Sequence, residues 1–452
     1  MKTLRDIAEG LWSGELDIAE EYHPVYTKFA HAEELLENVL VFKGTATANV
    51  VDTGDGLVML DTGGFKDTDA LFAETRKWRP DVPLAAAVYS HHHLDHVFGV
   101  TPFDKEASER GWARPVVYAH ALVPVNFDRY RRMPGLQATL SRRQLTSARS
   151  SLPTVASESG GGSTFGWPVD YRYPDVTHET GMTFRRGNMT FELHFGKGET
   201  DDHTWTWVPE LKAVHTGDLF IWCLPNAGNP QKVQRFAGEW AKSLRAMASK
   251  GAEVLLTGHG LPIFGSDRVE QALTETAEVL EHLEAETLRL MDTGACVDEV
   301  IHQVRVPERL RDRPFLQPIY DDPQFIVRNI WRLQGGWYDG QPDSLLPAPR
   351  HELASEWVTL AGGVDHVMKR VRELMLEGDL RLASHLVEFA HLAAPSSDEV
   401  HALRASVYSE RSNSITASIA RNIFRHTAAS SEAGQRDLAS HQMSLAARRG
   451  NQ

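Results

Sequence analysis

The sequence predicts a layered α/β domain followed by a helical domain, and three observations lead to this prediction. Short β-rich runs such as "NVLVFKG", "LAAAVYS" and "AEVLLTG" alternate with helical segments up to about residue 285, which is typical of a layered α/β domain with functional loops at its strand ends. Beyond that point the strand patterns stop, and apolar residues recur at helical spacing, as at Val364, Val367, Val371 and Leu374. The length of 452 residues is too great for one ordinary core, so we expect two or three domains.

The domain boundaries follow from these patterns. We place the α/β domain at residues 1–285 and the helical domain at residues 290–430, and we expect a polar, frayed tail over residues 431–452. Within the first domain, residues 131–181 are rich in Arg, Ser, Gly and Pro. A long irregular insertion of this kind is usually a functional lid or a disordered stretch.

Composition limits the partners and the compartment. The formal net charge of −14 argues against a nucleic acid or an anionic membrane as partner, although a buried metal can still attract an anionic small molecule. The sequence contains no run of 18 apolar residues and no signal-peptide pattern, so we expect a cytoplasmic protein. The two cysteines, Cys223 and Cys296, lie too far apart in sequence to suggest a cysteine-based zinc site.

The segment "HHHLDH", residues 91–96, indicates a metal site, because it directly follows the strand-like run "LAAAVYS". Side chains at alternate positions of a loop can turn toward one point, so His91 and His93 can share one metal ion. Asp95 and His96 can then face a second metal ion. Neutral imidazole and carboxylate are natural zinc ligands.

Further ligands are expected at later strand ends, because four residues cannot complete two sites. His203, Asp218 and His259 each lie at the end of a predicted strand or in the adjoining loop. Asp61 is a candidate for orienting a ligand imidazole through a hydrogen bond. We interpret a further set of histidines as unrelated surface side chains: His92, His120, His215 and His282.

These motifs, in this order, resemble the metallo-β-lactamase superfamily over roughly residues 38–265; the matching stretches are "LDTGG", "SHHHLDH", "GETDDH", "HTGD" and "TGH". The resemblance implies a four-layer αβ/βα sandwich with a dinuclear zinc site. It assigns one zinc ion to His91, His93 and His203. It assigns the other to Asp95, His96 and His259, with Asp218 as the bridge. Manganese or iron could occupy the same ligands.

The helical part resembles the dimerisation domain of alkylsulfatases, notably in "GWYDGQP" and "LAGG". This resemblance implies a homodimer that hydrolyses alkyl sulfate esters. That branch commonly has a glutamate-containing "GTEAP"-type segment where this chain has "GETDDHT", and a glutamate where this chain has Asp218. Its members often carry a further C-terminal lipid-carrier-like domain, whereas this sequence stops soon after the helical part. We therefore expect short or secondary alkyl chains.

The predicted mechanism uses a hydroxide that bridges two zinc ions and is oriented by Asp95 and Asp218 as catalytic residues. Arg142 and Arg143 are candidates for binding the anionic head group, because guanidinium groups match sulfate oxygens. The same site could cleave a phosphoester, a lactone or a thioester. Di-iron redox chemistry is a weaker alternative, because such relatives have a glutamate at the position of His93 and a flavin domain. A non-catalytic binding protein is disfavoured by the complete ligand set.

Overall fold

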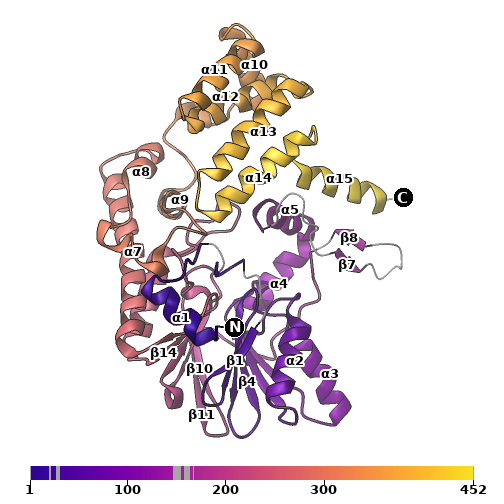
Figure 1. Cartoon of the computed structure of the whole chain (residues 1–452), viewed down its shortest axis with the longest axis vertical. Helices are drawn as coiled ribbons and strands as arrows, with labels where there is room; N and C mark the ends of the chain where they lie inside the picture. The colour runs from indigo at the N-terminus through magenta and orange to yellow at the C-terminus, as the bar shows by residue number, and fades with distance from the viewer. Residues whose placement is uncertain are drawn as a thin grey trace. The chain divides into compact units, whose positions relative to one another are not determined.

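The computed structural model describes residues 2–19, 22–26, 31–145, 154–156, 163–165 and 167–450. The chain forms two compact units. The first comprises residues 1–132 and 169–337, and the second comprises residues 133–168 and 338–452 (Figure 1). Among the described residues, no helix combines the length and the apolar character that a membrane span requires.

The first sheet of unit 1 has seven strands in the described residues, in the order β1-β2-β3-β4-β5-β6-β9. Neighbouring strands are antiparallel from β1 to β4 and parallel from β4 to β9. The strands are β1 (His31–Leu36), β2 (Val39–Lys43), β3 (Thr47–Asp52), β4 (Leu57–Leu60), β5 (Leu84–Val88), β6 (Val116–His120) and β9 (Val176–His178). β2 and β4 are buried along their whole length, as expected for apolar runs covered on both faces.

The second sheet of unit 1 has the described order β10-β11-β12-β13-β14-β15. Its strands are antiparallel except for the parallel pair β13 and β14. The strands are β10 (Gly181–Arg186), β11 (Met189–Phe195), β12 (Thr204–Val208), β13 (Ala213–His215), β14 (Val254–Leu256) and β15 (Ile263–Phe264). The continuous stretch "WTWVPELKAVHTG", residues 205–217, thus contributes to two strands, β12 and β13, which are separated by the 3-10 turn η1 (Pro209–Leu211).

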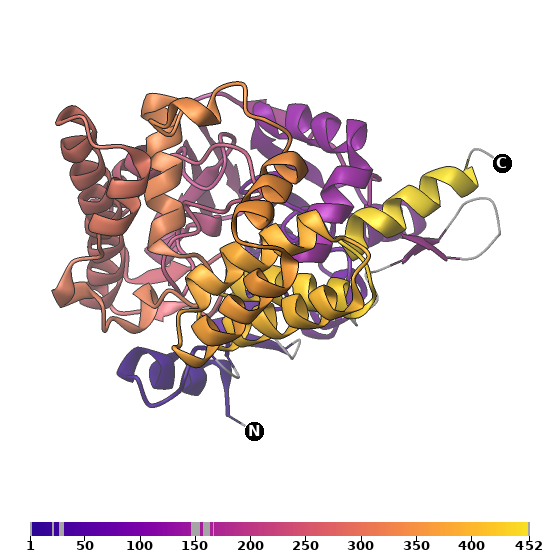
Figure 2. The ribbon, with the colours of Figure 1, turned by 90° about the horizontal axis from the view of Figure 1, so that it is seen from above.

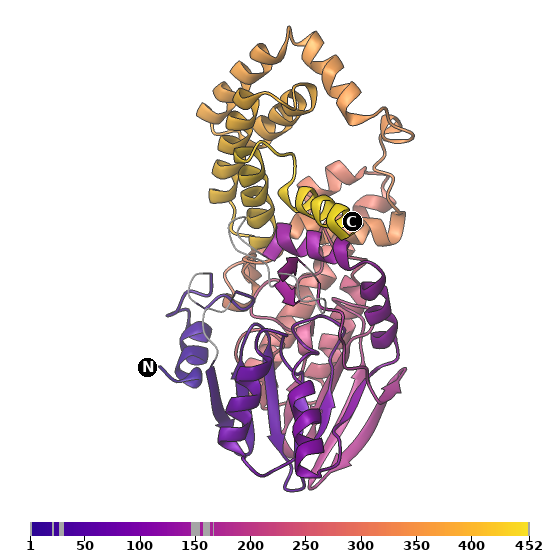
Figure 3. The same cartoon turned by 90° about the vertical axis from the view of Figure 1, so that its right-hand side faces the viewer.

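Helices cover the outer faces of the two sheets. α2 packs against β2 of the first sheet, and α7 packs against β14 and β15 of the second. Figure 1 shows the strands of the two sheets between α7 on one side and α2 on the other, and Figure 3 views the same layers from the side of α2. The predicted four-layer αβ/βα sandwich is confirmed. The helices of unit 1 are α1 (Leu4–Ser13), α2 (Thr68–Trp78), α3 (Thr101–Arg110), α4 (Leu122–Arg132), α6 (Ala237–Ala248), α7 (Ser266–Asp292), α8 (Val297–Gln303) and α9 (Pro323–Gly335), with 3-10 turns η2 (Gly217–Leu219), η3 (Glu308–Leu310) and η4 (Pro314–Leu316).

Unit 2 is mainly helical in its described residues. Its core includes Val367, Val371 and Leu374 of α11, packed with Val387 and Val400, so the apolar face predicted from helical spacing is confirmed. Its orange and yellow helices are seen from above in Figure 2. The elements are α5 (Pro134–Leu145), β7 (Thr154–Ala156), β8 (Ser163–Phe165), η5 (Pro342–Ser344), α10 (Arg350–Leu360), α11 (Val364–Leu376), α12 (Leu380–Ala393), α13 (Asp398–Asn413), α14 (Ser418–Glu432) and α15 (Leu438–Gly450).

The structure divides the chain differently from the predicted boundaries. The expected boundary at 285–290 lies inside α7, because Thr287 and Leu290 continue its buried face. Residues 133–168 of the insertion join the helical unit, where α5 packs against α14 and α15. The expected polar tail is helical over α15. The predicted lid or disordered stretch falls in part on residues 146–153, 157–162 and 166, which lie outside the described residues.

Candidate metal centre

The loop after β5 presents the predicted ligands. His91 and His96 are fully buried, while the side chains of His93 and Asp95 retain 15% and 29% exposure and so face an accessible side of the site. The loop turns back on itself, since the His96 N–H donates to the His93 carbonyl oxygen at 3.1 Å. The loop is also anchored to the segment that follows β4, because the Thr62 hydroxyl donates to the His96 carbonyl oxygen at 2.9 Å.

A first ligand group contains His91, His93, Glu199 and Asp218, whose ligand atoms lie within 4.8 Å of one another. His91 Nε2 and His93 Nδ1 are 2.8 Å apart. Glu199 Oε2 lies 3.9 Å from His91 Nε2 and 3.8 Å from His93 Nδ1. Asp218 Oδ2 lies 3.8 Å from His91 Nε2. Two imidazoles and two carboxylates thus face one point.

A second ligand group contains Asp95, His96 and His259. Asp95 Oδ2 lies 3.2 Å from His259 Nε2 and 3.9 Å from His96 Nε2. Asp218 reaches this group as well, with Oδ1 3.3 Å from His96 Nε2 and Oδ2 3.4 Å from His259 Nε2. Asp218 therefore stands between the two groups, in the position of a bridge. Gly258 permits this approach, because a Cβ there would lie 2.4 Å from Asp218 Oδ1.

The donor atoms fit a cation. Within the described part of the chain, His96 Nε2, Glu199 Oε2 and Asp218 Oδ1 are buried without a hydrogen-bond partner. Buried polar atoms are rarely left without a partner, and these three all point into the same two groups. A metal ion would satisfy them, since imidazole nitrogen and carboxylate oxygen are its usual ligands.

The protonation states of His91, His93 and Asp218 suit metal binding. Burial alone would lower the pKa of His96 and of His259, but Asp218 outweighs burial and raises both pKa values, so each of these two rings would release a proton on binding a metal. Burial lowers the pKa of His91 and of His93 well below its usual value, and neighbouring imidazoles act in the same direction. Both rings are therefore neutral and offer a lone pair. Burial alone would raise the pKa of Asp218, but His259 and His96 outweigh it and hold that pKa well below the usual range. Asp218 is therefore a carboxylate.

Glu199 is the ligand candidate that sequence reasoning missed. Its Oε1 accepts hydrogen bonds from the buried Arg235 guanidinium and from the Asn226 side-chain amide, which leaves Oε2 directed at His91 and His93. Burial raises the pKa of Glu199 to about 8, against the effect of Arg235. The sequence did contain a pointer to Glu199. This residue lies in "GETDDHT", the segment that we compare with the glutamate-containing "GTEAP"-type segment of alkylsulfatases.

His203 is the predicted ligand that the structure does not bring into either group. Its Nε2 lies 3.2 Å from the Thr216 carbonyl oxygen, to which it donates. Its ring stacks on the His91 ring with centroids 4.6 Å apart. Burial lowers the pKa of His203 to about 4. The residue therefore packs behind His91, and the other six predicted ligands come together with Glu199.

Asp61 occupies the predicted supporting position behind the ligands. Its carboxylate accepts hydrogen bonds from the Ser90 N–H at 2.7 Å and the Ser90 hydroxyl at 2.8 Å. It also faces His96 Nδ1 at 2.8 Å. A proton is thereby held on Nδ1 of His96, and Nε2, which faces Asp95 and Asp218, is the nitrogen that would bind a metal. Burial opposes ionisation of Asp61, but His96 outweighs it and lowers the pKa of the carboxyl.

Three of the four histidines interpreted as surface residues are buried, and His120 is one of them at 5% exposure. His92 and His215 are each 1% exposed. His92 Nδ1 lies 2.8 Å from Asp202 Oδ2, and Arg129 lies 3.4 Å from its Nε2, so the ring faces away from the ligand groups. Alternation along the loop explains this, because His91 and His93 point to the metal side and His92 between them points to the opposite side.

The predicted head-group residues Arg142 and Arg143 are not among the side chains gathered at the centre. Both lie on α5 of unit 2. Arg143 Nε donates to Asp437 Oδ2 at 2.8 Å, and its Nη2 donates to Ser440 Oγ at 3.0 Å. The Arg143 guanidinium thus serves to join α5 to the C-terminal helices.

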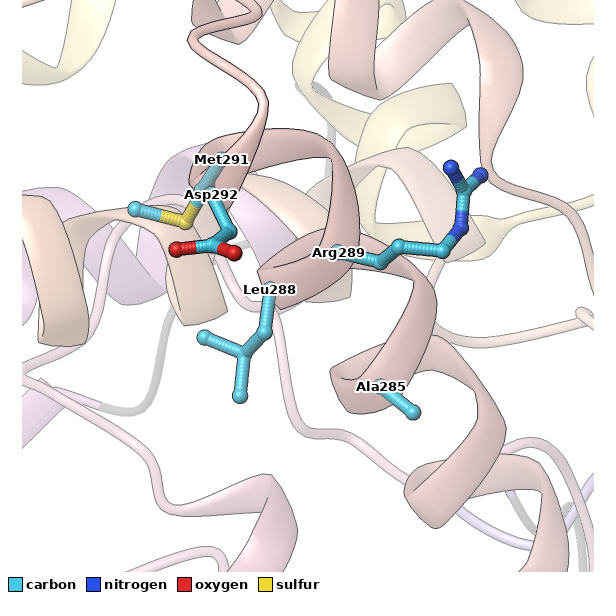
Figure 4. A pocket seen from close by; sticks show the side chains of 5 residues that line it. All are labelled: Ala285, Leu288, Arg289, Met291 and Asp292. Atoms are coloured by element: carbon cyan, nitrogen blue, oxygen red, sulfur yellow. The ribbon is translucent and has the colours of Figure 1, made fainter.

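A pocket at the C-terminal part of α7 is not part of the centre. Figure 4 shows its lining side chains, Ala285, Leu288, Arg289, Met291 and Asp292. Arg289 pairs with Glu286 of the same helix at 2.9 Å. None of the ligand residues lines this pocket, and its only charged groups are one arginine and one aspartate.

Comparison with known proteins identifies relatives of both parts of the chain. Residues 42–259 match the metallo-beta-lactamase superfamily, and residues 296–434 match the alkyl sulfatase dimerisation family. A linear primary-alkylsulfatase of a Pseudomonas species is 27% identical over 356 residues, covering 75% of this chain and 65% of the relative. An (R)-specific secondary-alkylsulfatase of Pseudomonas is 25% identical over 409 residues, covering 86% of this chain and 61% of the relative.

The solved structure of the stereoselective inverting sec-alkylsulfatase Pisa1 from Pseudomonas has the same fold. It matches with a TM-score of 0.79 at 23% identity, covering 90% of this chain and 66% of that protein. The chain spans less than two thirds of the length of the curated relatives that it matches. The two matched ranges and the shared fold show that the chain contains a domain of the metallo-beta-lactamase superfamily followed by an alkyl sulfatase dimerisation domain.

Proposed function

We propose that the protein is a dinuclear metal hydrolase that cleaves alkyl sulfate esters, with short or secondary chains favoured. The observation that supports it most is the position of Asp218 between two complete ligand groups. The similarity to relatives named alkylsulfatases points to the substrate class. The reaction consumes water and yields an alcohol and hydrogen sulfate.

Zinc is the proposed metal at both positions, because imidazole and carboxylate ligands suit it. His91, His93 and Glu199 would hold one ion, and Asp95, His96 and His259 would hold the other, with Asp218 between them. The same oxygen and nitrogen donors also accept manganese or iron.

The chain's residues position water and substrate around this centre. When bound, two metal ions would lower the pKa of a water to about 7 and neutralise an anionic head group. Asp95 and Asp218 are carboxylates on the accessible and the bridging side of the centre, where they orient the attacking water. Arg235 donates to Glu199 Oε1. This contact keeps Glu199 Oε2 directed at the metal position and away from the substrate side.

Recognition of a sulfate head group needs further positive charge in a chain whose net charge is −14. Lys232 is the proposed contact: it is half-buried, and its charge acts on His93. Burial and Arg235 lower the pKa of Lys232 to about 8, against the effect of Glu199 and Asp95. Arg142 and Arg143 stay predictions for the same role, although Arg143 already pairs with Asp437.

Sulfate release is the test of this function. We expect the zinc-loaded protein to release inorganic sulfate from short or secondary alkyl sulfates, as measured by ion chromatography. Asp95→Ala should lower the rate by about three orders of magnitude, because a metal ion contributes several kcal/mol to such a transition state. Asp55→Ala, in an exposed turn, is the matched control and should leave the rate unchanged.

Two outcomes would contradict the proposal. One is sulfate release that persists in Asp95→Ala. The other is no sulfate release by protein shown to contain two metal ions per chain. That result would favour a phosphoester, a lactone or a thioester as the substrate. Running the reaction in ¹⁸O-labelled water identifies the bond that breaks. The label appears in sulfate for S–O cleavage and in the alcohol for C–O cleavage.

We further propose that the helical unit forms a homodimer through α10. This helix buries Ala354 and Val358 on one face. Beside that face the helix exposes an apolar row at helical spacing, with Leu353 46%, Trp357 53% and Leu360 71% exposed. An apolar row of this kind, in a region that matches a dimerisation family, favours a second copy of the chain as its partner.

Replacing Trp357 tests the dimer. Trp357→Ser should weaken dimerisation by about 30-fold or more, because buried tryptophans dominate interface energies with 2 kcal/mol or more each. The dissociation constant is measured by analytical ultracentrifugation. Val125→Ser, at a residue 54% exposed on α4 of unit 1, should leave it unchanged. A monomeric wild-type protein at micromolar concentration would contradict the proposal.

A further inference from the structure

The loop that contains His259 is held by the start of β3. The Thr47 N–H donates to the Gly258 carbonyl oxygen at 2.8 Å, and the Thr47 hydroxyl donates to the Gly260 carbonyl oxygen at 2.8 Å. Between these two contacts, His259 Nδ1 lies 3.0 Å from the Thr45 carbonyl oxygen. A carbonyl oxygen only accepts, so Nδ1 of His259 carries a proton, and Nε2 is the nitrogen that would bind a metal.

A buried lysine holds the backbone turn at residues 44–46, which precedes Thr47. Lys43, the last residue of β2, is 4% exposed. Its ammonium group donates to the Gly44 carbonyl oxygen at 2.5 Å and to the Pro24 carbonyl oxygen at 3.3 Å. It also lies 3.4 Å from the Thr45 carbonyl oxygen, which is the oxygen that faces His259.

A carboxylate fixes the same turn from its amide side. The Thr45 N–H donates to Asp67 Oδ2 at 2.9 Å. Thr45 is therefore bound on both sides of its Cα, at its N–H by Asp67 and at its carbonyl oxygen by Lys43, and these two contacts direct the oxygen toward His259. Burial lowers the pKa of Lys43 to about 7, against the effect of Asp67 and Asp95, but the amino group offers N–H donors to the carbonyl oxygens in either protonation state.

We propose that Lys43 is a positioning residue for the metal centre: through the Thr45 carbonyl oxygen it sets the orientation and the tautomer of His259. The inference rests on the two-metal centre proposed above. Thr47 holds the same ligand loop by a separate pair of hydrogen bonds and provides an independent variant.

Electrostatics and positioning predict opposite results for removal of this lysine. A positive charge near the Asp95 group repels a metal cation, so Lys43→Met should tighten metal binding if the charge alone mattered. If Lys43 acts by positioning, Lys43→Met should weaken binding by about 10–100-fold, the range typical for removing a group that orients a ligand imidazole.

The experiment is a zinc titration against a chromophoric chelator, which gives the affinity without any substrate. Glu199→Ala serves as the background, because the Asp95, His96 and His259 group then remains as the intact set. Lys43→Met and Thr47→Val in that background should each lower the remaining affinity by about 10–100-fold. Thr75→Val removes a buried hydroxyl bond within α2 and should leave the affinity unchanged.

The zinc affinities of these variants distinguish a positioning role of Lys43 from general destabilisation. Unchanged or tighter zinc binding in Lys43→Met would overturn the inference, and a loss in Thr47→Val alone would assign the positioning of His259 to Thr47 instead. An equal loss in Thr75→Val would also overturn it, because general destabilisation would then explain the effect. The zinc stoichiometry of the wild-type protein tests the two-metal centre separately, so the failure of one proposal is distinguishable from the failure of the other.

Discussion

Glu199→Ala is expected to lose one of the two metal ions and to lower sulfate release by about three orders of magnitude. Glu199 is a carboxylate ligand candidate of the first group, and its Oε2 is buried without a hydrogen-bond partner among the described residues. Its removal also leaves the Arg235 guanidinium buried without its carboxylate partner, which adds a repulsive charge beside the first metal position. Metal content is measured by mass spectrometry of the desalted protein.

His203→Ala is the informative comparison for Glu199→Ala. The predicted ligand set named His203, whereas the structure directs His203 Nε2 to the Thr216 carbonyl oxygen. We therefore expect His203→Ala to retain both metal ions and most of the activity. The opposite pattern, with metal lost in His203→Ala and kept in Glu199→Ala, would return His203 to the ligand set and remove Glu199 from it.

Asp61→Ala is expected to lower the free energy of unfolding by about 3–5 kcal/mol, the range for removing one partner of a buried charged contact. The Asp61 carboxylate is fully buried and faces the Ser90 N–H, the Ser90 hydroxyl and His96 Nδ1. All three groups would be left without this acceptor. Chemical denaturation of the metal-free protein measures the effect, and Asp55→Ala in the same hairpin should change the free energy by less than about 0.5 kcal/mol.

Asp61→Asn separates the structural role of Asp61 from its role toward the metal. The asparagine oxygen can still accept from the Ser90 N–H, but its amide group is a donor toward His96 Nδ1. His96 would then carry its proton on Nε2, the atom that faces Asp95 and Asp218. We expect a smaller stability loss than in Asp61→Ala with a similar loss of metal affinity. Full metal affinity in Asp61→Asn would contradict the assigned tautomer.

Much of the centre could be predicted because its ligands lie next to each other in sequence or at strand ends. His91, His93, Asp95 and His96 share one loop, and the alternation of side chains along that loop separates them into two groups. The apolar runs of β2, β5 and β14 and the helical spacing in α11 predict a layered α/β domain and a helical unit for the same reason, since these are local patterns with fixed periods.

Contacts between distant segments decided the rest. The sequence by itself determined the fold class, the metal-binding loop and six of the gathered ligands, because strand periodicity and motif spacing are local properties. Only the tertiary structure brings Glu199, and not His203, to the first group of candidate ligands, since the Arg235 and Asn226 side chains that hold Glu199 come from a later segment. The tertiary structure also packs α5 against the C-terminal helices. It brings Lys43 and His259 to the same acceptor, the Thr45 carbonyl oxygen. Each of these depends on which side chains meet across the chain, and no local pattern encodes that.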